Sequence, residues 1–321
     1  MKTSSNMKNT FIKSISKTSS IQSSNATEKA SNQTTNSKSV NQSRAFQNKK
    51  QCSHSYQNVN LENAQNNVCP CEETEYTNAV SILLPTRKAA SGATVNKTEY
   101  VVADGINPYV YIYSFCGMFK GAVPTLRPYS KIVYSMETDS YYALDGYCSS
   151  NIYTLNCRFE EIGKTTSECS SKLTGISLFN GSDNRCINSH CPLNSIEDCP
   201  NAERLLLTSP RSVFLSSKTG SLASMIRSSC RNVFINSFVA VENGFAESYC
   251  ENSLEYIRIS ICCKETTFSI PRCVYVKNLF TTDGGGIYGF FGKNYTNGYI
   301  LPIYENECIN MDLTNFLLGK V

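Results

Sequence analysis

Apolar and polar residues alternate with a period of two along most of the chain after Glu99, which is typical of β-strands. Residues 254–263 show the pattern well, because Ile257, Ile259 and Ile261 fall on one face of a predicted strand. Many of the alternating positions are aromatic or β-branched, the residue types that suit a pleated sheet. The other segments with this pattern are 109–115, 132–136, 141–147, 152–159, 233–241, 274–280 and 299–304.

Turn-forming pairs separate these predicted strands, as expected when antiparallel strands are joined by short connections. Asp104–Gly105, Asp145–Gly146 and Asn297–Gly298 are three such pairs. Helix signals are few: residues 200–207 begin with a proline, and residues 221–227 follow a glycine. We therefore expect a mainly β protein, namely a disulfide-rich antiparallel sandwich or barrel-like ectodomain with one or two short helices and a disordered N-terminal tail. No internal repeat is evident.

The first 50 residues differ in composition from the rest of the chain. They contain nine basic residues and one acidic residue, and 29 of the 50 are Ser, Thr, Asn or Gln. Such a segment cannot bury enough apolar surface to offset the chain entropy that is lost on ordering. We predict a disordered basic Ser/Asn-rich tail at 1–50, a cysteine-rich β domain at 51–210, and a second β region with a glycine- and aromatic-rich loop at 211–321.

Cysteine content favours an oxidising compartment, because sixteen cysteines are far more than a reduced cytosolic chain of 321 residues needs. Structural zinc sites favour pairs spaced Cys-x2–4-Cys; Cys-x2-Cys is absent, Cys186-x4-Cys191 is the one pair within this range, and only His54 and His190 could add imidazole ligands. We therefore expect disulfides, whose connectivity the spacing does not define, and no bound metal. The cysteines expected to pair are Cys52, Cys69, Cys71, Cys116, Cys148, Cys157, Cys169, Cys186, Cys191, Cys199, Cys230, Cys250, Cys262, Cys263, Cys273 and Cys308.

Acceptor triplets for N-glycosylation support the same compartment. Asn96, Asn180 and Asn294 each begin an Asn-x-Ser/Thr triplet in the cysteine-containing part of the chain. The N-terminus has no apolar segment of the kind found in secretory signal peptides, and no run of apolar residues is long enough to span a bilayer. We expect an extracellular or virion-surface location through the secretory pathway despite the missing signal, which a larger precursor would supply.

Catalytic motifs are absent. The chain has no His-Glu-x-x-His, no nucleophile elbow and no phosphate-binding loop of the Walker type. Residues 284–289 match the spacing of a dinucleotide-binding loop, but the residues that follow are too rich in glycine and aromatic residues to form the required helix. We therefore expect a protein that is not an enzyme and uses no cofactor.

Glycines and large apolar residues gather in residues 283–293. We expect them to form a loop that meets a membrane or a partner. The residues of this predicted site are Gly284, Gly285, Gly286, Ile287, Tyr288, Gly289, Phe290 and Phe291. The segment resembles the fusion loops of class II viral membrane-fusion proteins, whose flavivirus form also runs from Asp through Gly and aromatic residues to Phe-Gly-Lys, although the cysteine of those loops is missing. The same residues also fit a strand–turn–strand with its aromatic side chains in the core.

A polar tail followed by a cysteine-dense, tyrosine-rich β body with glycosylation triplets is similar to virion surface glycoproteins of insect-infecting positive-strand RNA viruses of the negevirus and cilevirus type. This resemblance implies a non-enzymatic virion or cell-surface glycoprotein that mediates attachment to a host surface, membrane insertion or fusion. Its partners would be a host surface receptor or a lipid membrane, and it could form a homo-oligomer. One alternative is a capsid-like protein that contacts RNA through the basic tail, the only segment expected to bind nucleic acid. The other is an intracellular zinc-stabilised interaction protein.

Overall fold

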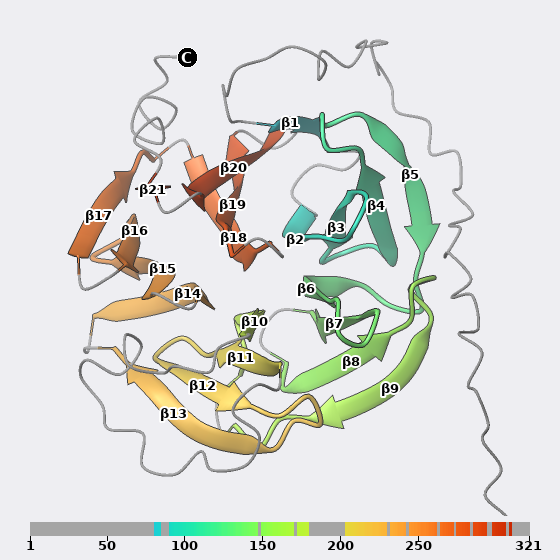
Figure 1. The fold of residues 1–321 in the computed structure, drawn as a ribbon, viewed down its shortest axis with the longest axis horizontal. Coiled ribbons are helices and arrows are strands. Elements are labelled where there is room, and N and C mark those ends of the chain that lie inside the picture. The colour runs from blue at the N-terminus through green and yellow to red at the C-terminus, as the bar shows by residue number, and fades with distance from the viewer. Residues whose placement is uncertain are drawn as a thin grey trace, which may run out of the picture. The chain divides into compact units, whose positions relative to one another are not determined.

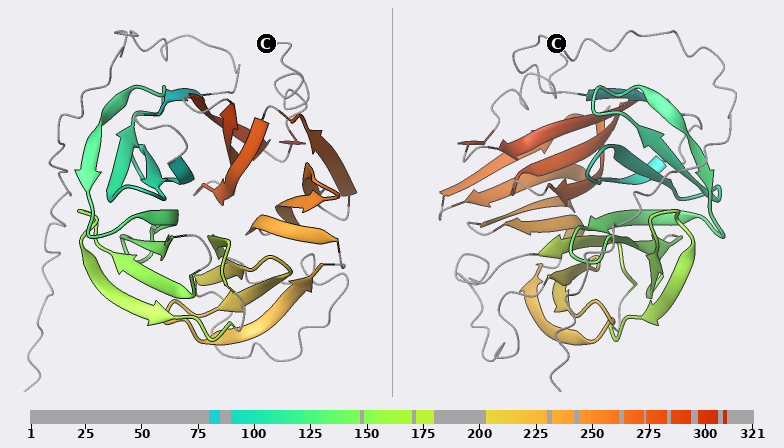
Figure 2. Two further views of the ribbon diagram at one scale, coloured as in Figure 1. Left: turned by 180° about the vertical axis from the view of Figure 1, so that it is seen from behind. Right: turned by 45° about the vertical axis from the view of Figure 1, so that its right-hand side comes forward.

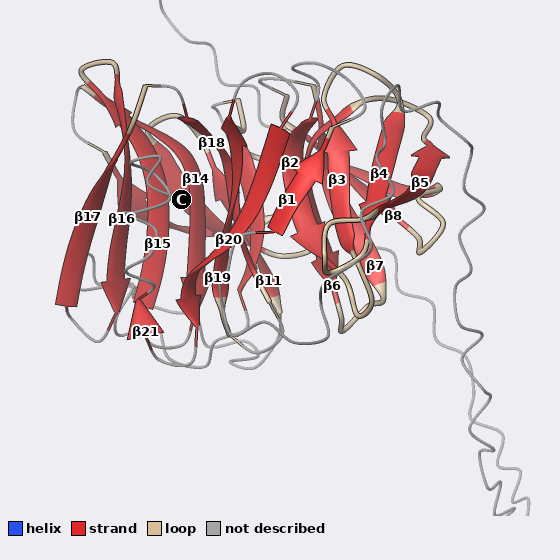
Figure 3. Ribbon diagram, turned by 90° about the horizontal axis from the view of Figure 1, so that it is seen from above, coloured by secondary structure: helices blue, strands red, loops and turns tan. Residues whose placement is uncertain are grey.

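The computed structural model describes residues 80–84, 90–146, 149–169, 172–179, 203–229, 232–241, 244–261, 264–272, 274–282, 285–293, 297–305 and 308–309. All of these residues belong to the unit Gln51–Val321, and the predicted basic tail at 1–50 lies outside the described residues. All regular secondary structure in these residues is β-strand (Figure 3).

Four of the five sheets are antiparallel meanders of four consecutive strands. The first contains β2 (Ala90–Val95), β3 (Tyr100–Asp104), β4 (Tyr109–Tyr113) and β5 (Phe119–Pro124). The second contains β6 (Tyr129–Ser135), β7 (Ser140–Asp145), β8 (Asn151–Leu155) and β9 (Glu161–Thr166). The third contains β10 (Gly175–Phe179), β11 (Arg204–Thr208), β12 (Ser212–Ser216) and β13 (Leu222–Ser228). The fourth contains β14 (Val233–Val241), β15 (Gly244–Glu251), β16 (Leu254–Ile261) and β17 (Lys264–Ile270).

The fifth sheet joins distant parts of the chain. Its first three strands are β18 (Val274–Thr281), β19 (Ile287–Lys293) and β20 (Asn297–Glu305). The early strand β1 (Val80–Leu83) pairs antiparallel with β20, and the short β21 (Cys308–Ile309) pairs with the other end of β20. A strand from before the first sheet therefore completes the last sheet.

The five sheets form a closed ring around an axis (Figures 1 and 2). Their first strands contact one another in the cyclic order β2, β6, β10, β14, β18 and back to β2. Five apolar clusters lie one in each junction between neighbouring sheets. This arrangement is a five-bladed β-propeller, with blades 1 to 5 being the sheets in the order given, and β1 closes the ring.

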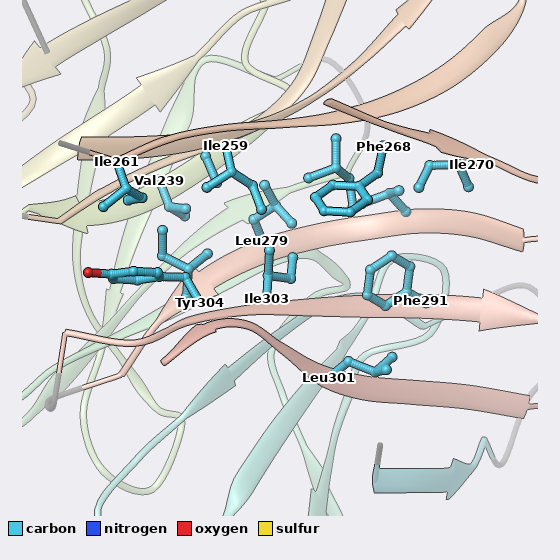
Figure 4. Close-up of a cluster of buried hydrophobic side chains, with 14 of the residues drawn as sticks. Val239, Ile259, Ile261, Phe268, Ile270, Leu279, Phe291, Leu301, Ile303 and Tyr304 are labelled. Atoms are coloured by element: carbon cyan, nitrogen blue, oxygen red, sulfur yellow. The ribbon is translucent and has the colours of Figure 1, made fainter. Parts of the chain in front are cut away.

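Burial on both faces of each blade explains how the ring is held together. In the cluster between blades 4 and 5, Ile259 and Phe268 point towards Leu279 and Phe291 of the opposite sheet (Figure 4). All residues of β3 and β6 are buried, whereas residues of the outer strand β9 alternate between half-buried and exposed. The hydrophobic effect over these five junctions is the main force that closes the ring.

The predicted sandwich or barrel with helices is therefore wrong. Period-two alternation predicts strands correctly, but it does not distinguish sheets stacked in two layers from sheets arranged around an axis. Residues 204–207 of the first predicted helix lie in β11, and residues 222–227 of the second lie in β13. The boundary drawn between residues 210 and 211 falls inside the β11–β12 hairpin of blade 3.

A repeat that is not evident in the sequence becomes visible once the blades are aligned. The third residue of the third strand is aromatic in every blade, namely Tyr111, Tyr153, Phe214, Tyr256 and Tyr299. Successive members are 42 or 43 residues apart, except for the step of 61 residues between blades 2 and 3. A spacing of this size is typical of propellers with four strands per blade. The long connection between β10 and β11, which follows Phe179, hides the period in the sequence.

Candidate functional site

The predicted membrane loop is a buried strand. Residues 287–293 form β19, which lies between β18 and β20. Phe290 packs in the cluster shared with blade 1 and Phe291 in the cluster shared with blade 4, and both are fully buried. Gly285 and Gly286 lie in the turn before β19, and Gly284 falls outside the described residues. The prediction of a viral surface glycoprotein that attaches to hosts or inserts into membranes is therefore wrong, and the strand–turn–strand alternative is confirmed.

Ile287 and Tyr288 follow the same pattern. Ile287 is fully buried and packs against blade 4, and Tyr288 is half-buried and donates a hydrogen bond from its hydroxyl to Glu305 at 2.7 Å. Gly289 lies in the middle of β19, where the Cβ of any larger residue would be 2.4 Å from the Phe291 ring. This glycine therefore serves close packing of the strand and not the turn of an exposed loop.

The predicted disulfide-rich scaffold is also wrong. Cys116 and Cys157 are each disulfide-bonded, but Cys250 is a free thiol, and Cys169 is packed in the apolar cluster between blades 2 and 3. Cys308 lies in β21. The sheets and their apolar junctions carry the fold. The cysteines outside the described residues are Cys52, Cys69, Cys71, Cys148, Cys186, Cys191, Cys199, Cys230, Cys262, Cys263 and Cys273.

Only one predicted glycosylation site falls in the described residues. The amide nitrogen of Asn96 donates hydrogen bonds to the Tyr141 hydroxyl at 2.8 Å and to Glu99 Oε1 at 3.5 Å. A glycan on this nitrogen would compete with the bond to Tyr141, which joins blades 1 and 2. Glycosylation and an extracellular location stay predictions, and Asn180 and Asn294 lie outside the described residues.

The described part of the chain contains neither a cluster of metal ligands nor a membrane-spanning helix. Within these residues, no three His, Cys, Asp or Glu side chains are grouped to hold a metal ion. His54 and His190 lie outside them. None of the described segments is a helix long and apolar enough to cross a bilayer.

β-Bulges occur at matching positions in the first strands, which line the axis of the ring. The first strand of four blades carries one extra residue, namely Ser91, Ser130, Asn236 and Lys277. The residue after each bulge then lies next to the first strand of the following blade. A bulge re-aims the local backbone, so these positions can form bonds across the blade junctions.

Polar side chains of three first strands bond to the first strand of the next blade; Asn278 and Ser237 follow a bulge, and Ser177 lies in the regular strand β10. Asn278 donates from its amide to Ala93 O and accepts from Ala93 N, both at 2.9 Å. The Ser237 hydroxyl accepts from Leu279 N at 3.0 Å, and the Ser177 hydroxyl donates to Phe238 O at 2.7 Å. Each bond thus satisfies buried main-chain groups of the next blade, which would otherwise cost free energy.

Blades 1 and 2 depart from this pattern, because they place Gly92 and Lys131 at the corresponding positions. A Cβ on Gly92 would lie 2.9 Å from Lys131 Cα, so glycine permits close approach of β2 and β6. Lys131 Nζ donates to the main-chain oxygens of the bulged residues Ser91, at 3.0 Å, and Lys277. Burial and the positive charge of Lys277 lower the pKa of Lys131 to about 7. A lysine therefore bridges three blades on the axis.

Blades 4 and 5 extend further than the other blades at one end of the ring. We name the end at which β2, β6, β10, β14 and β18 begin the proximal face. β14 and β18 begin three residues before their bulges, whereas β2 and β6 begin one residue before theirs. The extra residues add length at the proximal face alone. They place Phe234 and Tyr275 at matching positions, two residues before the bulges.

The extended ends expose large apolar side chains beside arginines. Phe234 is 48% exposed, Tyr275 is 45% exposed, and Leu254, at the start of β16, is 38% exposed. Arg211 lies in the β11–β12 turn and Arg272 in the β17–β18 connection, and both are exposed. We call these five residues the proximal patch. Exposed aromatic residues and arginines are the types enriched in protein interfaces.

Local contacts hold three of the five patch residues, Arg211, Phe234 and Leu254, in place. The Arg211 guanidinium lies 5.6 Å from the centre of the Phe234 ring. The turn that carries Arg211 is fixed to blade 4 by a hydrogen bond from Ile235 N to Pro210 O at 2.9 Å. Leu254 follows a two-residue turn whose backbone φ angles are both positive, 49° at Asn252 and 66° at Ser253. Little conformational freedom would therefore be lost when a partner binds.

Titratable groups lie directly below the patch, at the junction of blades 4 and 5. Val276 N donates to Glu255 Oε2 at 3.1 Å, and burial raises the pKa of Glu255. Burial lowers the pKa of Lys277, an effect that the negative charge of Glu255 partly offsets. Burial and the charge of Glu255 raise the pKa of the Cys250 thiol. The alternation of apolar and polar residues did not predict that these three titratable residues lie together. The aromatic repeat is the sequence signal that could have found them, because it aligns the strands of the five blades.

Comparisons with known proteins identify no family and find only distant structural likenesses. No protein-family model and no curated protein matches the chain. Hydrazine synthase of Kuenenia stuttgartiensis is similar at 12% identity, over 64% of this chain and 61% of that chain, with a TM-score of 0.37. The WD40 β-propeller domain of Doa1 is similar at 8% identity, over 68% of this chain and 96% of that domain, also with a TM-score of 0.37. The chain spans about three fifths of that hydrazine synthase chain. These likenesses are too distant to carry an argument, and the order of the strands itself identifies the propeller.

Proposed function

We propose that this protein is a non-enzymatic scaffold that binds a protein partner through the proximal patch. The observation that carries the proposal is the exposure of Phe234 and Tyr275 at matching positions of two blades. The strand extensions that expose them are not required by the ring, because β2 and β6 close it without them. Exposed aromatic side chains are typical anchors of protein interfaces.

The chemistry of the axis supports a scaffold rather than a catalyst. Lys131 has the lowered pKa that a general base or a nucleophile would need, but its ammonium group donates to two main-chain oxygens. Glu255 accepts a hydrogen bond from a main-chain N–H. These groups therefore stabilise the ring, and the exposed patch above them is left for binding.

Selection from a random peptide library displayed on phage tests the proposal. The wild-type ring should enrich peptides that a Phe234→Asp/Tyr275→Asp double variant fails to bind. Ile162→Asp is the matched control, because Ile162 is 62% exposed on the outer strand β9 of blade 2. Circular dichroism should show that all three proteins are folded. Equal enrichment by the wild type and the double variant, or no enrichment by the wild type, would refute the proposed function.

A further inference from the structure

We infer that the partner of the proximal patch presents an acidic segment, and that Lys277 receives one of its carboxylates. This inference rests on the proposed function and concerns the chemistry of the partner. The argument starts from the environment of Lys277, because this cation lies at the junction of the patch and the axis.

Lys277 is a half-buried cation without an acceptor in the described part of the chain. Its side-chain nitrogen forms no hydrogen bond and no ion pair with any described group, and its only charged neighbour of opposite sign is Glu255. The acidic group of Glu255 is itself bound to Val276 N. A cation that is partly removed from water and lacks an acceptor favours an anion from outside.

The geometry places this cation next to Tyr275. Tyr275 pairs with Gly292 across the β18–β19 ladder, so their side-chain positions share one face of blade 5. A Cβ on Gly292 would lie 3.0 Å from Lys277 Cε, so the aliphatic part of Lys277 crosses the space that glycine leaves on that face. An apolar anchor on Tyr275 and a carboxylate on Lys277 can therefore belong to one short segment of a partner.

The surrounding charges favour the same sign of partner. Arg211 and Arg272 have no acidic partner among the described residues, and they flank the aromatic residues. With Lys277 they form a group of three cations. Among the described residues here, these three cations outnumber the carboxylates of Glu251, which pairs with Leu254, and Glu255. The buried Lys131 adds positive charge beneath them. A net positive site attracts acidic segments and repels basic ones, most strongly at low ionic strength.

The selected peptides provide the test. Acidic residues should be enriched next to an aromatic or aliphatic residue. Lys277→Met should lower the affinity for such peptides by about tenfold or more, whereas Lys277→Arg, which keeps the charge, should retain most of the affinity. The melting temperature of Lys277→Met should not fall, because the substitution removes a partly buried charge and keeps the main-chain oxygen that Lys131 uses. Raising the salt concentration should weaken peptide binding by the wild type more than peptide binding by Lys277→Met.

The outcomes separate this inference from the proposed function. Neutral or basic peptides that depend on Phe234 and Tyr275 would overturn the inference and leave the proposed function standing. Acidic peptides that bind Lys277→Met as well as the wild type would also overturn it. If no selected peptide binds the wild type better than the Phe234→Asp/Tyr275→Asp variant, the proposed function is refuted, and the inference is refuted with it.

Discussion

Lys131 should make the stability of the ring depend on pH, and Lys131→Met should remove that dependence. In the unfolded chain the lysine keeps its ordinary pKa of 10.5, whereas in the folded ring the pKa is lowered to about 7 by burial and by Lys277. Between these values the unfolded state binds a proton that the folded state has released. The free energy of unfolding therefore rises with pH across this range, and the gain is lost as pH falls to about 7.

The expected size follows from the shift. Each pH unit in the range contributes about 1.4 kcal/mol, so the wild type should gain about 3 kcal/mol from Lys131 between about pH 7 and pH 9.5. Methionine does not titrate and has a similar length. It leaves the main-chain oxygens of Ser91 and Lys277 without their donor. The loss costs about 1–3 kcal/mol of stability for each oxygen, and this cost does not depend on pH. The free energy of unfolding should therefore rise with pH more steeply in the wild type than in Lys131→Met.

Urea denaturation at a series of pH values measures this difference. Near-ultraviolet circular dichroism of the nineteen tyrosines can follow unfolding, because the chain has no tryptophan. Cys250, with a raised pKa, titrates in both proteins and cancels in the comparison, whereas Lys277 is coupled to Lys131, so the difference reports Lys131 together with this coupling. Lys172→Met, at an exposed lysine, is the control and should leave the pH dependence unchanged. A constant difference between wild type and Lys131→Met across the range would show that Lys131 stays protonated, and the reasoning would fail.

Three further substitutions test the packing and the ion pairs by urea denaturation. Gly92→Ala should destabilise the ring by about 1–3 kcal/mol, because its Cβ would be 2.9 Å from a neighbouring Cα, whereas Gly163→Ala, 3.5 Å from its nearest neighbour, should cost much less. Phe290→Ala should cost about 3–5 kcal/mol because the ring is fully buried, and Tyr275→Ala should cost under about 1 kcal/mol; equal costs would contradict the buried placement of β19. Glu247→Gln should cost about 3–5 kcal/mol, because it breaks the buried ion pair with an arginine of blade 3 at 2.6 Å, and a change below about 1 kcal/mol would contradict it.

The alternation of residues was enough to predict strands, because side chains in a strand project to opposite faces whatever the sheet packs against. Residues 109–113, 233–241 and 254–261 are strands as expected. The aromatic residue at the third position of each third strand, Tyr111 and Tyr256 among them, also carries the repeat. That signal is local, so the amino-acid sequence contains it without any information on packing.

The packing of the sheets depended on contacts between residues far apart in the chain. Phe290 and Phe291 are adjacent in a glycine-rich segment, and an exposed loop and a buried strand fit that segment equally well. They are buried because β1, from about 200 residues earlier, completes the sheet beside them, and because neighbouring blades cover both faces.

The axis and the patch depend on the ring in the same way. Lys131 meets the main-chain oxygens of Ser91 and Lys277 only when five blades close, since blades 1, 2 and 5 must converge. The proximal patch likewise gathers Arg211, Leu254 and Tyr275 from three blades. Residue types and local spacing specify strands and turns, whereas burial and charge environment arise from long-range packing.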